Sequence, residues 1–542
     1  MKILYVNPGK IEAGLDYIIK GPPLALLTIA AMVPEHEATL FDFKVDKYKE
    51  KNFRKLLREH DVCAITSMTP QISHAFEVAE MAKEEGCTTI IGGYHPTLEP
   101  DYVIKHSAVD FIVRGEGEHT FRELITYIDS SEQDTESSKK KEILGISYKT
   151  TEETIQHNDQ RPLEADLDKF PIPRRDLLKG KKYQYLGTRV MLMETSRGCP
   201  HNCKFCCIIK MWADGTNTMR YRAKSINRII EEIYSIDLDA WDFIFFNDDN
   251  FTINVKRTKA ILEVLIKSKL HRKVFFSCQS RVDTLYKNKW LAPMMREAGF
   301  RQIFLGIESV HQQSLDAMNK RSNVNMIQEA CKMCTDNGIS MFGGMIIGFP
   351  GETMEMVREN TAFAQSLGLD FVQFTPITAF PGTEFFEEMR KAGKVDTLEW
   401  KYYNLFYPML HTDEISREDM YRLVAESYAK FYMGKDFFKQ MAHRALLNPN
   451  FKWYRKIGPR WLKQVVMGGW KMLAAQGVSS DLIIEISTEK EDHSQGKWHK
   501  YLAFKKDILK YRYEKFKQLL VRAQEKQIDL EPIYAKMHPR IH

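Results

Sequence analysis

Short apolar runs alternate with amphipathic, helix-like segments in two separate stretches of this 542-residue chain. Strand and helix signals that alternate at this spacing indicate βα units, in which the strands pair in parallel and the helices cover the sheet. Ligands of such folds bind beside the carboxyl ends of the strands. The sequence therefore predicts an α/β protein whose functional groups follow its strands.

The first stretch covers residues 1–140. Apolar runs predict buried strands at residues 2–6, 38–41, 62–66, 88–91 and 109–113. Helical patterns separate or follow them at residues 24–33, 48–59, 72–85, 100–106 and 118–128. This order predicts a doubly wound, Rossmann-like parallel sheet.

Three strand ends of this domain carry small or flexible residues. The candidates for ligand contact are Ser67 and Thr69 after the third strand, Gly92, Gly93 and His95 after the fourth, and Gly115 and Glu116 after the fifth. Glycine allows turns with positive φ and close approach of the backbone to a ligand. Hydroxyl groups can hydrogen-bond the amide side chains of a ligand. An ordinary nucleotide-binding or docking unit remains an alternative, because glycine-rich strand ends alone are weak evidence.

The second stretch covers residues 186–390 and follows a linker, residues 141–185, that contains a predicted hairpin and a proline-rich connector. Its strands are predicted at residues 190–194, 243–247, 274–277, 302–306, 341–347 and 371–375. Helical patterns follow the first five. Six such units form a partial (β/α)6 barrel, whose active site is expected at the carboxyl ends of the strands.

Three cysteines follow the first barrel strand with the spacing Cys-x3-Cys-x2-Cys: Cys199, Cys203 and Cys206. Soft thiolates suit iron–sulfur chemistry, and three of them can ligate three irons of a [4Fe–4S] cluster. The fourth iron would then be open to another ligand. A Cys3His zinc site that uses His201 is the alternative, although this histidine lies inside the loop and leaves it little slack to surround one ion.

The nine cysteines form an odd, clustered set, which fits a reducing compartment with a metal site better than a disulfide framework. Cys331 and Cys334 would share one helix face and Cys278 would end a strand, so all three are interpreted as core residues. Cys207 directly follows a cluster ligand and is either a packing residue or a reactive thiol.

Composition sets broad limits on the protein. Hydrophobic residues make up 44% of the chain and the net charge is +6, so well-packed cores are expected and nucleic acid is not indicated. No signal peptide is visible, and the apolar stretch at residues 21–34 is too short to span a bilayer. We expect a cytoplasmic protein.

The C-terminal region, residues 391–542, has a mainly helical pattern, for example at residues 416–433. Aromatic and basic residues are interleaved at 451–456, 460–463 and 470–471. A helical cap that closes the active site is the favoured interpretation, and contact with a membrane surface is the next. Stacking on nucleic acid is the least favoured, because no RNA-binding module is recognisable.

The cysteine run, with Phe205 before its third cysteine, resembles the motif of the radical S-adenosylmethionine (SAM) enzymes. The resemblance implies that the open iron binds SAM and that an electron from the cluster cleaves it to a 5′-deoxyadenosyl radical. It also implies SAM contacts at later strand ends. The residues in those positions are Arg281, Glu308, Ser309, Gly344 and Gly348. A buried ion pair is the alternative role of Glu308.

The strand ends of the first domain resemble the cobalamin-binding domain that precedes many radical SAM cores. The Asp-x-His-x-x-Gly run of domains that supply a histidine to cobalt is absent from the sequence. The resemblance therefore implies cobalamin without a protein histidine below the cobalt, and His95 is interpreted as a structural or amide-contacting residue.

The whole chain resembles the cobalamin-dependent radical SAM enzymes, and among them the anaerobic magnesium-protoporphyrin IX monomethyl ester oxidative cyclase family. That implies either oxidative cyclisation of a tetrapyrrole-like substrate or methylation of an unactivated carbon through methylcobalamin. A small or lipophilic substrate and an electron donor such as flavodoxin or ferredoxin would be the partners, with no nucleic acid and with peripheral contact to the inner membrane face left open. A non-catalytic cobalamin sensor or carrier is a further alternative, against which the intact cysteine triplet argues.

Overall fold

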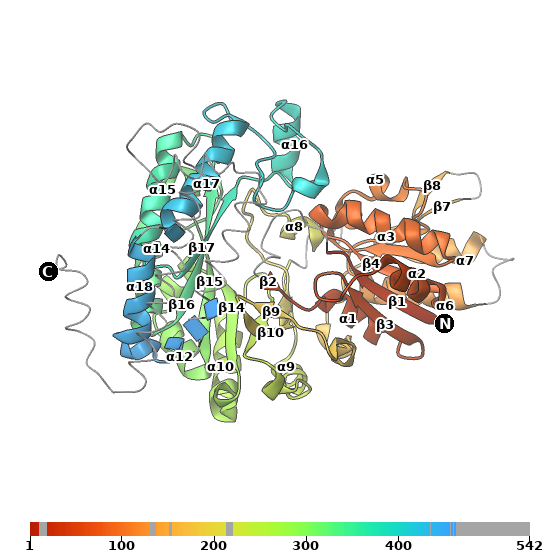
Figure 1. The fold of residues 1–542 in the computed structure, drawn as a ribbon, viewed down its shortest axis with the longest axis horizontal. Helices are drawn as coiled ribbons and strands as arrows, with labels where there is room; N and C mark the ends of the chain where they lie inside the picture. Colours follow the sequence, from red (N-terminus) through yellow and green to blue (C-terminus); the bar gives the residue numbers. More distant parts are fainter. Residues whose placement is uncertain are drawn as a thin grey trace.

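Two α/β bodies lie side by side in the computed structural model (Figure 1). The structure describes residues 1–9, 19–130, 137–150, 154–212, 220–433, 435–455, 457–458 and 460–461. The basic and aromatic run at 470–471 and the remainder of the predicted C-terminal region lie outside the described residues.

The first body is built on a seven-stranded sheet with the order β3-β1-β4-β5-β6-β7-β8. Its strands are β1 (Lys2–Asn7), β3 (Glu37–Asp42), β4 (Val62–Thr66), β5 (Thr88–Gly92), β6 (Phe111–Val113), β7 (Ile146–Lys149) and β8 (Ile155–His157). The five predicted strands are confirmed and pair in parallel. The predicted hairpin is also confirmed. It extends the sheet, because β7 pairs antiparallel with β6.

Helices connect these strands and pack in pairs. They are α1 (Leu24–Ala31), α2 (Glu50–Arg58), α3 (Ile72–Glu84), α4 (Tyr94–Leu98), α5 (Pro100–Ile104), α6 (Gly117–Asp129) and α7 (Ser137–Glu142). Helix α1 packs on α6, and α2 packs on α3. Apolar side chains between these helices and the sheet are fully buried, so the carboxyl ends of the strands are held on a rigid support.

Helix α4 was not predicted: the sequence analysis treated the residues after the fourth strand, among them Gly93 and His95, as a flexible strand end that faces a ligand. The chain turns at Gly93, with φ of 111°, and then forms a short helix that begins at Tyr94. Pro96 is tolerated there because the first turn of a helix needs no N–H donors from its early residues. Successive helical side chains point in different directions, so Tyr94 and His95 face different surroundings.

The second body is built on an eight-stranded sheet with the order β17-β16-β15-β14-β13-β10-β9-β2. Its strands are β2 (Ile19–Lys20), β9 (Gln184–Tyr185), β10 (Thr188–Met193), β13 (Phe243–Phe246), β14 (Phe275–Arg281), β15 (Phe300–Glu308), β16 (Ser340–Ile347) and β17 (Phe371–Pro376). The six from β10 to β17 run parallel, which confirms the partial barrel. Strand β2 comes from the N-terminal part of the chain and pairs with β9, so a segment between β1 and α1 of the first body forms the edge strand of the second sheet.

Helices follow the barrel strands as predicted. They are α8 (Ile208–Met211), α9 (Ile226–Tyr234), α10 (Val255–Ser268), α11 (Val282–Lys287), α12 (Leu291–Ala298), α13 (Gln312–Ala317), α14 (Val324–Asp336), α15 (Met354–Ser366), α16 (Glu384–Lys391), α17 (Arg417–Met433) and α18 (Lys435–Leu446). Cys331 and Cys334 are buried on α14, and Cys278 is buried in β14, as expected of core residues. A two-stranded antiparallel ribbon flanks the cysteine loop: β11 (Ser196–Arg197) precedes it and β12 (Arg222–Ala223) follows it.

The described end of the C-terminal region packs at the amino ends of the barrel strands. Trp461 is fully buried and lies 5.8 Å from Phe243 and 5.3 Å from Phe371, ring centre to ring centre. These phenylalanines are the first residues of β13 and β17. Phe451 and Tyr454 are also fully buried. These three aromatic residues therefore belong to the core at the amino ends of the strands. They form neither the expected cap over the active site nor an exposed surface for a membrane or nucleic acid.

Another C-terminal segment contacts the first body. A 3-10 helix, Trp400–Tyr402, follows α16, and Trp400 packs on His95 and Tyr102 with ring centres 5.1 and 6.1 Å away. This segment also contacts the turn Thr69–Gln71, which follows the carboxyl end of β4 in the first sheet. In the described residues, no helix is both long and apolar enough to cross a membrane.

Candidate active site

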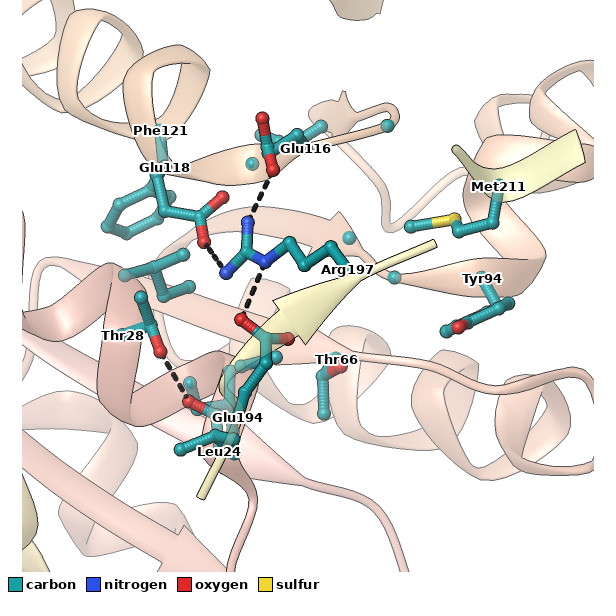
Figure 2. Close-up of a pocket in the computed structure, with 18 of the residues that line it drawn as sticks. Leu24, Thr28, Thr66, Tyr94, Glu116, Glu118, Phe121, Glu194, Arg197 and Met211 are labelled. Carbon is teal, nitrogen blue, oxygen red and sulfur yellow. Dashed lines mark hydrogen bonds and ion pairs between the residues drawn. The ribbon is translucent and has the colours of Figure 1, made fainter. Parts of the chain in front are cut away.

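A cavity of about 250 Å³ lies between the two bodies, where the carboxyl ends of their strands face each other. One wall comes from the first domain and includes Thr66, Met68, Gly93, Tyr94, Gly115, Glu116 and Glu118. The opposite wall comes from the barrel and includes Glu194, Ser196, Arg197, Met211, Trp212, Asn247 and Asp249. Figure 2 shows side chains of both walls pointing toward one another. Ligands of such folds bind at the carboxyl ends of the strands, and here the carboxyl ends of both sheets face the same cavity.

The inner part of the cavity is apolar. It extends between helices α1 and α6 and the first sheet and is lined by Leu24, Ile29, Ile65, Ile90 and Phe121. A flat aromatic group would be accepted there, while a charged group would lose its hydration without compensation. The cavity therefore offers apolar and polar surfaces to different parts of one ligand.

Two predicted glycines are needed where the backbone meets this cavity. Gly93 has φ of 111°, and a Cβ atom there would lie 2.8 Å from the carbonyl oxygen of Ser67. Gly115 has φ of 71°, which strains any other L residue. Gly92 and Glu116 also line the cavity. These four predicted residues are brought together as the sequence analysis expected.

The other predicted contacts of the first domain lie behind this wall. Ser67 is fully buried and its hydroxyl donates to the carbonyl of Met68 at 3.0 Å, while Thr69 is also buried; neither lines the cavity. His95 is fully buried against Tyr102 and Trp400, and burial lowers its pKa from 6.5 to about 4. The structure therefore places a neutral His95 in a packing position on the far side of α4.

Cys199, Cys203 and Cys206 lie on one loop directly after β11, next to the cavity. The loop is held by backbone bonds from Lys204 to the carbonyl of Met318 at 3.1 Å and from Cys206 to that of Cys203 at 3.1 Å. Among the described residues, no three His, Cys, Asp or Glu side chains converge closely enough to hold a metal ion. Burial raises the pKa of the Cys199 and Cys206 thiols, so iron must replace their protons on binding. Three thiols on a short loop are the donor set that an iron–sulfur cluster takes.

Two carboxylates that follow β13, those of Asp248 and Asp249, hold the residues on either side of the cysteine loop. Asp249 accepts hydrogen bonds from the backbone N–H of Gly198 at 2.8 Å and from Trp212 Nε1 at 2.9 Å. Asp248 accepts from the backbone N–H of Thr195 at 2.6 Å and from the hydroxyl of Ser196 at 2.8 Å. Burial raises the pKa of Asp249 from 3.8 to about 6. Asp248 and Asp249 thus support the residues that precede Cys199.

Arg281 is the predicted barrel residue that lies nearest to the cysteines. Its guanidinium donates to Cys203 Sγ at 3.5 Å and to Asp283 at 2.9 Å. Burial lowers the pKa of this arginine, but Asp283 and Cys203 outweigh that effect and raise it. A permanent positive charge beside a cluster ligand favours the thiolate.

Glu308 ends β15 at a register shift, with φ of 68°, and forms a buried ion pair with Lys320. The sequence analysis held this ion pair as the alternative role. Lys320 Nζ also lies 6.0 Å from the ring centre of Phe205. Irregular strands and unusual φ values at a strand end re-aim side chains and are typical of functional sites. Contact of Glu308 and Phe205 with SAM stays a prediction.

The remaining predicted SAM residues have defined structural surroundings. The Ser309 hydroxyl bonds Glu352 and Asn360, both at 3.0 Å. A Cβ atom at Gly344 would lie 3.2 Å from the ring of Phe304, and one at Gly348 would overlap Met420 of α17. Gly348 also has φ of 73°, which strains any other L residue, whereas Gly344 is only closely packed. Contact of either glycine with adenine stays a prediction.

The sequence analysis missed several residues of the cavity walls: Tyr94, Glu118, Glu194, Arg197, Trp212 and Asp249. Two signals could have revealed some of them. Arg197 stands two residues before Cys199, and Glu118 repeats the acidic residue of the Gly-Glu-Gly-Glu run. Tyr94 and Trp212 carried no signal beyond being aromatic.

Comparison with known proteins matches both bodies. Residues 193–364 match the radical SAM superfamily, and residues 19–125 match the B12 binding domain. An uncharacterized methyltransferase of Pyrococcus horikoshii is 32% identical over 81% of this chain and 95% of its own length. The chain belongs to the radical SAM enzymes that carry a B12-binding domain.

Further relatives span the family. The anaerobic magnesium-protoporphyrin IX monomethyl ester cyclase of Rubrivivax gelatinosus is 28% identical over 81% of this chain and 79% of its own length. Among solved structures, the cobalamin-dependent S-adenosylmethionine radical enzyme OxsB with aqua-cobalamin and S-adenosylmethionine bound has a TM-score of 0.62 at 18% identity, over 97% of this chain and 80% of its own. The methyltransferase TsrM of Kitasatospora setae, with cobalamin and a [4Fe–4S] cluster, has a TM-score of 0.62 at 14% identity, over 90% and 99%.

The protein is therefore a cobalamin-dependent radical SAM enzyme that uses a [4Fe–4S] cluster, SAM and cobalamin and acts on a small molecule. The residues of the site fit these groups: three thiols on one loop for the cluster, and glycine-rich strand ends with an apolar inner slot for cobalamin. A sensor or carrier without catalysis is not supported by this membership.

Proposed function

We propose that this enzyme methylates an unactivated carbon of a small-molecule substrate. The observation that carries the proposal is a cavity that both domains line, with Gly93 and Gly115 on one wall and Arg197, two residues before Cys199, on the other. A group held on one domain can therefore be delivered to a carbon that is activated from the other. The methyltransferase from Pyrococcus horikoshii, which this chain matches along nearly its full length, also favours methylation.

When bound, the cluster, SAM and cobalamin supply an adenosyl radical and a transferable methyl group. The chain's own residues then have three tasks. Cys199, Cys203 and Cys206 would hold the cluster, and Gly93 and Gly115 would let the first domain approach cobalamin closely. The apolar inner wall would exclude water from reactive groups.

Anaerobic turnover of the reconstituted protein tests the proposal. The protein is incubated with hydroxocobalamin, SAM, titanium(III) citrate and candidate substrates, and two products of SAM are quantified. Methylation is expected to release 5′-deoxyadenosine and S-adenosylhomocysteine together, in proportion to methylated product. Release of 5′-deoxyadenosine alone with a cyclised product would contradict it.

Oxidative cyclisation is the second candidate, because cyclases of the family match this chain over a similar span. The same assay separates the two functions. Substrate panels follow from the relatives: tetrapyrroles from the cyclases and bacteriochlorophyllide methyltransferases, tryptophan from TsrM and a hopanoid from the C-3 methylase. The apolar inner wall supports a lipophilic substrate.

We further propose that flavodoxin or ferredoxin donates the electron and that membrane contact, if the substrate is a lipid, is peripheral. Lys204, within the cysteine loop, is 40% exposed and pairs with Glu388 at 2.8 Å, so the loop reaches the surface where a donor protein could approach the cluster. A reconstitution with either donor in place of titanium(III) citrate checks this point.

Substitution of Cys203 by alanine has the largest expected effect on turnover. Loss of one cluster ligand should lower both SAM products by about 1,000-fold or more, since the residual reaction lacks the cofactor chemistry. Iron analysis and the SAM assay measure this. Cys278→Ala is the matched control, because that buried cysteine lies in β14 and should leave iron content unchanged. Turnover by the Cys203 variant at the wild-type rate would contradict the assignment of the cluster.

A further inference from the structure

A buried cluster of charges joins the first domain to the residues that precede Cys199. The Arg197 guanidinium donates to three carboxylates: Glu116 at 2.5 Å, Glu118 at 2.6 Å and Glu194 at 2.7 Å (Figure 2). The side chain of Arg197 is 8% exposed, and those of Glu116 and Glu118 are 6% and 7% exposed. Two of the three carboxylates belong to the first domain, and the third follows β10 of the barrel.

A second arginine completes the cluster. Arg222 faces Arg197 across the β11–β12 ribbon and donates to both carboxylate oxygens of Glu116 at 2.9 and 3.0 Å. Burial alone would raise the pKa of Glu118, but the Arg197 charge and hydrogen bond outweigh it and lower that pKa. All three carboxylates of the cluster thus have a cationic partner.

Such a cluster does more than hold two bodies together. A guanidinium has a planar, rigid set of donors, so three carboxylates around it fix its position and its orientation. Buried ion pairs contribute little net stability compared with apolar packing, and their best-supported role is to specify one arrangement. Here the arrangement is that of the run Gly115–Glu118 of the first domain relative to the cysteine loop of the barrel.

A short series of contacts connects the run Gly115–Glu118 of the first domain with Cys199 of the barrel. Glu116 and Glu118 belong to the run that begins at Gly115, on the cobalamin side of the cavity. Arg197 is followed by Gly198, whose N–H is held by Asp249, and then by Cys199. A displacement of the first domain is therefore transmitted toward the cysteine loop directly through Arg197, and indirectly through Arg222, which pairs with Arg197 across the ribbon.

We propose that Arg197 is a positioning residue that sets the place of the cysteine loop relative to the cobalamin-binding run Gly115–Glu118. The inference rests on the joint use of cluster and cobalamin in the proposed function, and it applies to methylation and cyclisation alike. Binding of the cluster by the three cysteines does not by itself require Arg197, and the proposal gives this arginine a separate role.

Electron paramagnetic resonance of the full-length protein tests this without a substrate. The protein is loaded with cluster and hydroxocobalamin and reduced stepwise to cob(II)alamin and then to the reduced cluster. The readout is the increase in the cob(II)alamin relaxation rate when the cluster becomes paramagnetic, because that increase falls steeply with the separation of the two centres. Wild type is compared with Arg197→Met and Arg197→Lys.

Loss of a supporting contact loosens a site by about 1 Å, so we expect the relaxation enhancement to fall by about twofold in Arg197→Met, with an intermediate value for Arg197→Lys. Arg175→Met is the matched control. Arg175 forms a similarly buried pair with Glu232 at 2.6 Å that does not involve the cavity, and its loss should leave the enhancement unchanged.

Arg197→Met leaves buried carboxylates without a partner and could fold poorly. The double variant Arg197→Met/Glu118→Gln removes one of those charges, while Glu116 keeps Arg222. An enhancement equal to that of wild type in either variant, at equal iron and cobalamin content, would overturn the proposal. If wild type itself gives no enhancement, the two cofactors are not neighbours and the proposed function fails with it. A normal wild-type enhancement together with unchanged variants overturns only the role of Arg197.

Discussion

The two ends of the barrel differ in what fills them. At the carboxyl ends of the strands lie a cavity, glycines with positive φ and the ion pairs of Arg197 (Figure 2). At the amino ends, Trp461 packs against the first residues of β13 and β17, Tyr454 packs against Trp461, and Arg444 forms a buried ion pair with Asp370. The same six strands therefore have a polar, open end and a closed, aromatic end.

This difference separates function from stability along one set of strands. Chemistry in barrels of this kind is located at the carboxyl ends, whereas residues at the amino ends mainly stabilise the fold. Substitutions at the two ends should thus give different phenotypes: altered cofactor binding at one and altered unfolding at the other.

Replacement of Trp461 by alanine should have the largest effect on stability. It removes a fully buried indole from between β13 and β17, which costs about 3–5 kcal/mol for a large aromatic side chain in a core. Chemical denaturation of the purified protein measures the free energy of unfolding. Hydroxocobalamin affinity of the folded fraction should not change, because the residue lies at the opposite end from the cavity.

Trp290→Ala is the control for that experiment. Trp290 is 38% exposed at the start of α12, so its loss should change stability by about 1 kcal/mol or less. Equal destabilisation by the two variants would show that the aromatic end is not a core.

Asp249→Asn tests the polar end of the barrel through the pH dependence of the free energy of unfolding. Burial raises the pKa of Asp249 to about 6, so the folded protein favours the protonated carboxyl and loses stability as pH rises from 3.8 to about 6. Asparagine keeps a hydrogen-bond acceptor and has no charge. Between about pH 4 and pH 7 the variant should gain up to about 3 kcal/mol relative to wild type.

Denaturation of the metal-free protein at several pH values measures this difference. Asp413→Asn is the control for the loss of a surface carboxylate: Asp413 is 78% exposed and pairs with Lys394, so its loss should change the free energy of unfolding by about 1 kcal/mol or less. A constant difference between wild type and Asp249→Asn across this range would mean that the carboxyl titrates as it does in the unfolded chain.

The smallest effect is expected for His95→Phe. His95 packs among aromatic rings behind α4 and does not line the cavity, so a ring of similar size should leave the hydroxocobalamin affinity within about threefold. Gly93→Ala is the contrasting variant, since its Cβ would meet Ser67 beside the cavity and weaken binding more. Absorbance titration measures the hydroxocobalamin affinity of both variants. A larger loss of affinity in His95→Phe than in Gly93→Ala would show that His95 contacts the cofactor.

Local sequence was sufficient to predict much of the fold. Apolar runs of 4–7 residues between helical patterns became β1, β3, β4, β5 and the barrel strands, because buried parallel strands need continuous apolar faces. The cysteine spacing predicted the cluster loop for a similar reason, since ligands in one short loop need no distant partner. Even so, α4 was missed, because a turn at Gly93 followed by five helical residues has no periodicity to detect.

The site walls depended on contacts that no local pattern contains. Arg197 is 81 residues from Glu116 in sequence, and Tyr94 enters the cavity while its neighbour His95 does not. The aromatic and basic run at 451–461 had the composition of a surface, yet Phe451, Tyr454 and Trp461 are in the core.

The sequence by itself determined the class of fold, the cysteine loop and the glycine-rich strand ends, because each depends on residues that are near one another in the chain. Only the tertiary structure decided which side chains face the cavity, which arginine joins the two domains and which end of the barrel the C-terminal aromatics close. Those outcomes depend on burial and on pairing of charges between distant segments, where the cost of desolvation selects one arrangement.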